Sequence, residues 1–156
     1  MVSENSLREL LESVKGRMQF DFYIAVYGTL MSGERNFYRL PKGEVKCIDN
    51  VLTDEAIFQM YINPSISTPN KMTPSVSFLQ NGHHLHVQIM NVTKAARDKM
   101  DDIEGVGENY ERVPVMIQKY PNAEIYLKRD TSKGILESPH RLYCPKTNSL
   151  KWSSNP

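Results

Sequence analysis

The first stretch of this sequence whose residue types could do chemistry is a loop that contains two glycines. Residues 22–26 are apolar and aromatic and predict a buried strand. The loop that follows, residues 27–36, reads Tyr-Gly-Thr-Leu-Met-Ser-Gly-Glu-Arg-Asn. A strand that breaks at a glycine leaves backbone amides without partners, and such amides can hold a carboxylate or a phosphate. The loop is therefore either an ordinary turn or half of an anion-binding site.

A glutamate at the end of a predicted helix is the second candidate. The helix covers residues 93–104, and its apolar face consists of Val92, Ala96, Met100 and Ile103. Glu104 lies at the edge of that face, where the helix dipole disfavours a negative charge by about 0.3–1 kcal/mol and partial burial disfavours it further. Both effects raise its pKa, as suits a general base. The alternative is that Glu104 points to solvent or pairs with Arg112. Asp101 and Asp102 are expected at the cap and on the surface.

Other reactive side chains give weaker indications. His84 and His86 would face one way on a strand, as metal ligands can, but no third ligand has suitable spacing. Cys47 and Cys144 match neither a C-x-x-C pair nor a disulfide framework, which predicts reduced thiols. Tyr110 opens a predicted strand and is either a pocket residue or part of the core. We therefore expect no metal and no cofactor.

The composition indicates one soluble domain without a polyanionic partner. A chain of 156 residues can bury a sizeable core. Its formal charge of +1, from 19 basic and 18 acidic residues, gives no indication of nucleic acid or an anionic membrane. Acidic residues gather between 98 and 112 and basic ones beyond 127, and both runs are expected to be solvated surface. No apolar run approaches the roughly 20 residues of a membrane span, and the acidic N-terminus does not suit a secretory signal. We expect a cytoplasmic protein.

The N-terminal part predicts a helix and then the first strand. The helix covers residues 6–15, with Ser6 and Glu9 at capping-box spacing. Its apolar stripe, Leu7, Leu10, Leu11 and Val14, is expected to pack against the domain's own core, with a partner protein as the alternative. The strand covers residues 20–27, and the end of the glycine loop predicts a helical turn stopped by Pro41.

The middle of the chain predicts mainly strands. Residues 45–62 predict two strands or one long bent strand, and the proline-rich residues 63–74 predict a loop. Residues 76–79 and 85–92 are predicted to form a hairpin around Asn81-Gly82, because this dipeptide is a strong two-residue turn signal.

The C-terminal part predicts a helix and another hairpin. The helix over residues 93–104 is expected to be capped by Thr93 and ended by Gly105. Residues 113–119 and 123–127 predict a hairpin with Pro121-Asn122 at its tip. We expect an α+β fold, a small mixed β-barrel with flanking helices. The expected segments are a helical extension over 1–19, a domain over 20–148 and a tail over 149–156.

Two segments resemble the signature sequences of the γ-glutamylcyclotransferase-like superfamily. The first is the loop at residues 27–30, Tyr-Gly-Thr-Leu, with a second glycine and an asparagine after it. The second is Met-Asp-Asp-Ile-Glu-Gly at residues 100–105, followed by Tyr110 and Arg112. The superfamily reads Leu-Asp-x-x-Glu-Gly here, with a downstream Tyr-x-Arg. Residues 138–145, Ser-Pro-His-Arg-Leu-Tyr-Cys-Pro, resemble the end of the γ-glutamylamine cyclotransferase branch.

This resemblance covers about residues 21–148 and implies both a fold and an activity. The implied fold is a small mixed β-barrel with flanking helices. The implied reaction releases 5-oxoproline and a free amine from a γ-glutamyl amide, without a cofactor. The residues implied to bind the γ-glutamyl group are Tyr27, Gly28, Thr29 and Leu30, with Tyr110 as a further pocket residue. Glu104 is the implied catalytic acid/base.

Two classes of function remain at this point. In the first, the chain is a γ-glutamyl(amine) cyclotransferase that acts on a small molecule. In the second, it is a catalytically silent module that binds an anionic small molecule, or docks a protein through helix 6–15 or the basic tail. The carboxylate of Glu104 favours the enzyme, because a pocket that only binds anions gains nothing from it.

Overall fold

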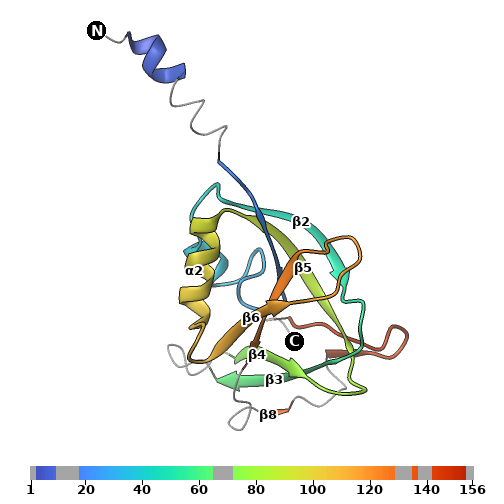
Figure 1. The fold of residues 1–156 in the computed structure, drawn as a ribbon. Helices are drawn as coiled ribbons and strands as arrows, with labels where there is room; N and C mark the ends of the chain where they lie inside the picture. The colour runs from blue at the N-terminus through green and yellow to red at the C-terminus, as the bar shows by residue number, and fades with distance from the viewer. Residues whose placement is uncertain (1–2, 10–17, 65–71, 129–134, 137–141, 154–156) are drawn as a thin grey trace.

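A computed structural model describes residues 3–9, 18–64, 72–128, 135–136 and 142–153 of the chain (Figure 1). Within these residues the strands form a seven-stranded sheet and a three-stranded sheet. Helix α2 (Lys94–Glu104) packs beside the larger sheet. The predicted α+β class is confirmed. No helix in this part of the chain is long and apolar enough to cross a membrane.

The larger sheet is built around two antiparallel strands, β1 (Phe22–Val26) and β5 (His84–Val92). On its other edge β1 pairs in parallel with β7 (Ala123–Lys128), which pairs with β6 (Tyr110–Pro114). The other edge of β5 pairs with β2 (Val45–Leu52). The strand that leads into the glycine loop therefore lies inside the sheet, with a partner on each side.

Short strands complete both sheets. In the larger sheet β10 (Ser149–Leu150) pairs with the start of β5 and with β9 (Tyr143–Cys144). In the smaller sheet β3 (Phe58–Pro64) lies between β4 (Met72–Phe78) and β8 (Ile135–Leu136). Residues 149–150, expected in the tail, thus belong to the larger sheet.

Strand β1 separates two layers of apolar core because its side chains alternate between the faces of the sheet. Ala25 faces the cluster that fills the space between the two sheets. Ile24 and Val26 face the cluster that α2 covers. All three are 2% exposed or less, and each large apolar side chain buried this way contributes about 1.5–3 kcal/mol. The beginning of the glycine loop is therefore held at a fixed place.

Several predicted elements are confirmed. The helix over residues 93–104 forms, with the Thr93 side chain accepting a hydrogen bond from the Ala96 amide and Gly105 in the left-handed conformation. Residues 45–62 hold two strands rather than one. The glycine loop ends in a 3-10 turn, Phe37–Arg39. A second hairpin also forms, but its first strand is β6, which begins at Tyr110 and ends at Pro114, and residues 115–119 of the predicted strand are not part of a strand.

The prediction of a hairpin over residues 76–79 and 85–92 is wrong. The Asn81-Gly82 turn does form, with Asn81 at φ 59° and the Gly82 amide donating to the Leu79 carbonyl at 3.0 Å. The strands on either side, however, belong to different sheets: β4 pairs with β3, and β5 pairs with β1 and β2. Val76 and Leu85 contact the same core from these two sheets. The two strands thus meet through this shared core and not through paired backbones, and the turn only connects them.

The ends of two other predictions also change. The segment predicted as a loop over 63–74 contributes residues to β3 and β4, with Pro74 paired to Ile62, while residues 65–71 lie outside the described part. In the N-terminal helix Ser3, not Ser6, is the cap, because its hydroxyl accepts from the Ser6 amide. Leu7 of this helix is 52% exposed. The rest of its predicted apolar stripe falls among residues that the structure does not describe.

Candidate active site

Three consecutive backbone amides of the glycine loop have no partner among the described residues. In the part of the chain that the structure describes, no group accepts a hydrogen bond from the N–H of Gly28, Thr29 or Leu30. The next amide, of Met31, donates to the Gly28 carbonyl at 3.0 Å and closes a tight turn. The three free amides are the kind of donors that hold an anion or a developing oxyanion.

Contacts from outside the turn hold the loop in this shape. Asn36 bonds to Thr29 twice: its backbone amide donates to the Thr29 carbonyl at 2.9 Å, and its Nδ2 donates to Oγ1 at 2.8 Å. The Ser32 amide donates to Oε1 of Gln88 on β5 at 2.7 Å. The asparagine and second glycine noted in the sequence thus belong to one rigid loop, in which Gly33 has φ 86°.

A pocket brings this loop and Glu104 together. Its lining residues are Ala25, Val26, Tyr27, Gly28, Thr29, Leu30, Thr73, Pro74, Glu104 and Tyr126. The glycine loop and Glu104, some 70 residues apart in the sequence, thus line one cavity. Tyr110 is not among the lining residues and lies in the core, 9% exposed. The pocket is narrow, since its enclosed part of about 20 Å³ holds about one water molecule.

Within this pocket Gly28 lies close to the ring of Pro74. A Cβ atom at position 28 would lie 2.5 Å from Cγ of Pro74. Next to it, the Arg35 guanidinium donates to the Thr73 hydroxyl at 2.6 Å and so links β4 to the glycine loop. Position 28 therefore needs glycine because a neighbouring ring occupies the place of a side chain.

Replacing Gly28 by Ala is expected to lower the free energy of unfolding by about 1–3 kcal/mol, because the added methyl overpacks the contact with Pro74. Denaturant unfolding measures this. Pro74→Ala removes the clashing Cγ, so the double variant should recover most of the loss. If Gly28→Ala were as stable as the wild type, the contact would not be tight in solution.

Helix α2 ends in a way that fixes the position of Glu104. Gly105 has φ 69°, and the Val106 amide donates to the Asp101 carbonyl at 3.0 Å, which closes the last turn. Met100 is fully buried, and Ile103 packs against the same cluster. This anchoring turns the Glu104 side chain toward the pocket. Asp102, on the opposite side of the helix, is exposed as predicted.

Burial raises the pKa of Glu104 to about 7, and the nearby Lys128 opposes this shift. Among the described residues, none donates a hydrogen bond to the Glu104 carboxyl. A largely desolvated carboxyl of this kind exchanges a proton near neutral pH.

Three buried tyrosines lie near Glu104, and their hydroxyls bond to other groups. Burial raises the pKa of Tyr27, Tyr110 and Tyr126, and the charge of Glu104 contributes to the shift of each. Their hydroxyls are engaged elsewhere: Tyr27 donates to the Tyr126 carbonyl at 2.7 Å, and Tyr126 donates to Asp101 at 2.7 Å. The hydroxyl of Tyr110 bonds to Ser75. The phenols therefore remain protonated.

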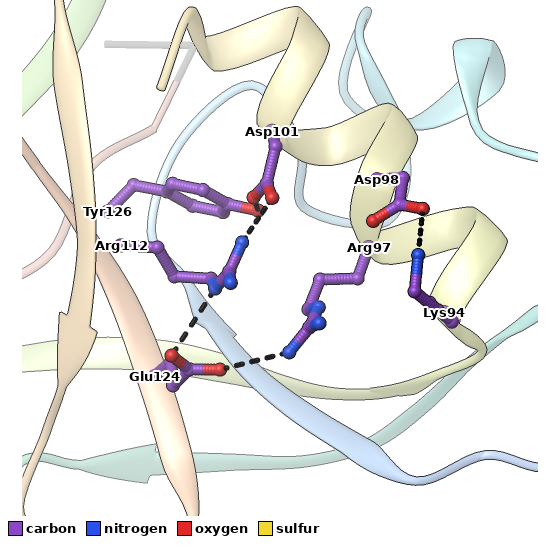
Figure 2. A network of polar contacts seen from close by, with 7 residues as sticks. All are labelled: Lys94, Arg97, Asp98, Asp101, Arg112, Glu124 and Tyr126. Atoms are coloured by element: carbon purple, nitrogen blue, oxygen red, sulfur yellow. Dashed lines mark hydrogen bonds and ion pairs between the residues drawn. The ribbon is translucent and has the colours of Figure 1, made fainter. Parts of the chain in front are cut away.

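A network of charges ties the end of α2 to the sheet (Figure 2). Asp101 accepts from both Arg112 of β6 and Tyr126 of β7. Arg112 also contacts Glu124 through Nε at 3.3 Å, and Glu124 lies 3.6 Å from Nη1 of Arg97. The hydrogen bond and charge of Asp101 raise the pKa of Arg112 above its usual value. Because Asp101 lies one turn before Glu104, the network fixes the turn that bears the carboxyl.

This network decides against one alternative and corrects one expectation. Arg112 pairs with Asp101 and Glu124, so it does not neutralise Glu104. Asp101, expected at the cap or on the surface, is a partly buried anchor. Sequence reasoning missed Tyr126, Thr73 and Pro74 as lining residues, because nothing in their local spacing distinguishes them from other strand residues.

The three histidines that the structure describes have partners within the chain. A ring nitrogen of His83 lies 2.7 Å from Asn148, one of His84 lies 2.8 Å from the Thr53 carbonyl, and one of His86 lies 2.9 Å from Ser149. No group of three metal-ligating side chains occurs within the described ranges. Cys47 and Cys144 are free and exposed.

Fold and site together define a small α+β protein whose pocket combines the free amides of a glycine loop with a carboxyl of raised pKa. The sequence profile of the family described as "Gamma-glutamyl cyclotransferase, AIG2-like" matches residues 24–152. The chain belongs to this family. Among curated proteins none is significantly similar to it.

Solved structures share the fold. Allophanate hydrolase from Kluyveromyces lactis is 14% identical with a TM-score of 0.57, and the match covers 74% of this chain but only 19% of that one. A uropathogenic E. coli-specific protein is 18% identical with a TM-score of 0.57, covering 74% of this chain and 86% of that one. An uncharacterized Pyrococcus horikoshii protein is 22% identical with a TM-score of 0.53, with the same coverage. At these identities the likeness concerns the fold alone.

Proposed function

We propose that this protein is a γ-glutamyl(amine) cyclotransferase that releases 5-oxoproline and a free amine from a γ-glutamyl amide, with Glu104 as the general acid and base. Membership of the family supports a cyclotransferase-like module. The single observation that favours activity is the placement of Glu104 in the same pocket as the free amides of Gly28, Thr29 and Leu30.

The reaction needs a group that can first accept a proton and then donate one. The α-amine of the substrate arrives as an ammonium, which is not a nucleophile. The Glu104 carboxylate takes one proton, the freed nitrogen attacks the γ-carbonyl carbon, and the bond to the leaving amine breaks. Overall, two protons pass from the attacking nitrogen to the leaving nitrogen. A carboxyl with a pKa of about 7 suits both directions of transfer.

The glycine loop supplies the electrostatic part of the mechanism. Its three amides hold either the α-carboxylate of the substrate or the oxyanion that forms as the ring closes. Holding the γ-glutamyl chain bent also brings its two reacting ends together, and such intramolecular positioning lowers the barrier substantially. Because the enclosed space is small, a bound γ-glutamyl group requires Thr73 and Pro74 to move back from the loop.

Incubation with a panel of γ-glutamyl compounds tests this function. The panel contains glutathione, γ-glutamyl amino acids and γ-glutamyl-ε-lysine, and the assay quantifies both 5-oxoproline and the released amine. At least one member should give the two products in equal amounts. Lack of turnover across the panel, together with tight binding of one of its members, would support a silent binding module instead.

The rate is expected to depend on pH through Glu104. Because its pKa is raised to about 7, kcat/KM should fall about tenfold for each pH unit below 7 and level off above it. A pH profile of kcat/KM on the best substrate checks this. A limb with a midpoint near 4.5, the ordinary glutamate value, would show that the working base is not a buried Glu104.

A further inference from the structure

A second pocket lies where two strands end against β5. Strand β1 pairs along β5 as far as Gln88, and β10 pairs as far as Leu85. Between these points, beside His86 and Val87, the sheet has a gap. The pocket at this gap has a volume of about 220 Å³, compared with about 20 Å³ for the pocket at Glu104.

One part of this pocket is rich in hydrogen-bond donors. Its polar lining residues are Asn50, His86, Gln88 and Lys151, and none of the lining residues that the structure describes is acidic. In the described part of the chain Lys151 has no ion-pair partner. Burial and the charge of Lys151 lower the pKa of His86, so the ammonium lies near the imidazole. Nε2 of His86 lies 2.9 Å from the Ser149 hydroxyl, which leaves Nδ1 of the ring for a ligand. The side-chain oxygen of Gln88 accepts a hydrogen bond from the Ser32 amide, so the side-chain NH₂ of Gln88 remains available as a donor.

The remaining walls are apolar. They consist of Tyr27, Met31, Val51, Leu52, Val87 and Trp152. Trp152 is 6% exposed and belongs to the core between the two sheets. A ligand that matches both parts has a single anionic head and an apolar body.

We propose that the gap between β1 and β10 is a binding site for a small carboxylate with an apolar body, held by Lys151, His86 and Gln88 against Trp152. A carboxylate suits these donors because it is compact and accepts several hydrogen bonds at once. Its apolar body replaces water along the Trp152 wall. Nothing in this site depends on cyclotransferase activity.

Two sources could supply such a carboxylate. Tyr27 lines both pockets, so the carboxylate could belong to the amine half of a γ-glutamyl substrate whose other half lies beside Glu104. It could equally belong to a separate small molecule. Both sources place the same chemical group beside Lys151.

Fluorescence of Trp152 tests the site directly, because this is the chain's single tryptophan. The full chain is titrated with 3-phenylpropionate and with the uncharged 3-phenylpropionamide, which has the same shape. We expect at least tenfold tighter binding of the acid than of the amide. Lys151→Met should bring the two dissociation constants within about twofold. Lys146→Met, which removes an exposed lysine outside the pocket, should leave the preference unchanged.

Kinetics then separate the two sources. If the amine half occupies the site, Lys151→Met raises KM for γ-glutamyl-alanine but not for γ-glutamyl-ethylamide. If a separate molecule occupies it, both KM values stay the same while the acid still binds. Equal binding of acid and amide, an unchanged preference in Lys151→Met, or no fluorescence response to either probe would overturn the site. These binding outcomes are independent of whether any γ-glutamyl compound is turned over.

Discussion

Replacing Glu104 by Gln is expected to lower kcat for 5-oxoproline formation by about 10²–10⁴-fold, the usual contribution of a general acid–base group. Glutamine has nearly the same shape but cannot accept the proton of the substrate ammonium or return it to the leaving amine. The substrate should still bind, since the loop amides are unchanged, so KM should change little. Steady-state kinetics on the best substrate of the panel measure both constants.

Loss of activity in this variant should not come from loss of the fold. The folded-state pKa of Glu104 is about 7, above the ordinary value of 4.5. The wild type therefore loses stability as pH rises from 4.5 to 7, by at most about 3 kcal/mol. Glu104→Gln should escape this loss and be at least as stable as the wild type at pH 8. An active Glu104→Gln would contradict the role of this residue, and a variant less stable than the wild type at pH 8 would contradict its raised pKa.

Replacing Arg112 by Gln is expected to lower the free energy of unfolding by about 2–4 kcal/mol. Asp101 and Glu124 would then lose the guanidinium between them (Figure 2), and partly buried charges left without a partner are strongly destabilising. The ion pair of Lys94 and Asp98, on helix α2 like Asp101, is the matched control. Its side chains are 72% and 53% exposed, so Asp98→Asn should cost only about 0.5 kcal/mol.

The same variant should also slow the reaction. Asp101 ties the last turn of α2 to β6 and β7, so its release lets the Glu104 carboxyl move relative to the loop. We expect kcat to fall about 10–100-fold under conditions where the variant is fully folded. Equal effects of Arg112→Gln and Asp98→Asn in denaturant unfolding would show that the network is ordinary surface charge.

Local patterns were sufficient to predict the pieces of the site. The glycine loop, the Thr93 cap, the Gly105 end of the helix and the inward edge position of Glu104 all follow from periodicity and capping, which act over a few residues. The α+β class follows from the same patterns. The juxtaposition of the loop with Glu104 came from resemblance to a family and not from local spacing.

Contacts between distant residues were not predictable in this way. Arg112 pairs with Asp101 and Glu124, and not with Glu104, because β6 and β7 pair beside α2. No local sequence pattern predicts that arrangement. The pairing of β4 with β3 instead of β5 places two sheets on one shared core, and the local turn signal at Asn81-Gly82 carries no information on that. The gap in the sheet at His86 likewise depends on where β10 ends.

Titration with 5-oxoproline followed by amide NMR tests most directly whether the glycine loop and Glu104 form one product-binding site. The amide signals of Gly28, Thr29 and Leu30 and the carboxyl carbon of Glu104 should shift together, with one dissociation constant. If saturating 5-oxoproline shifted only signals elsewhere, or shifted the loop amides but not the Glu104 signal, the loop and Glu104 would not form a single site.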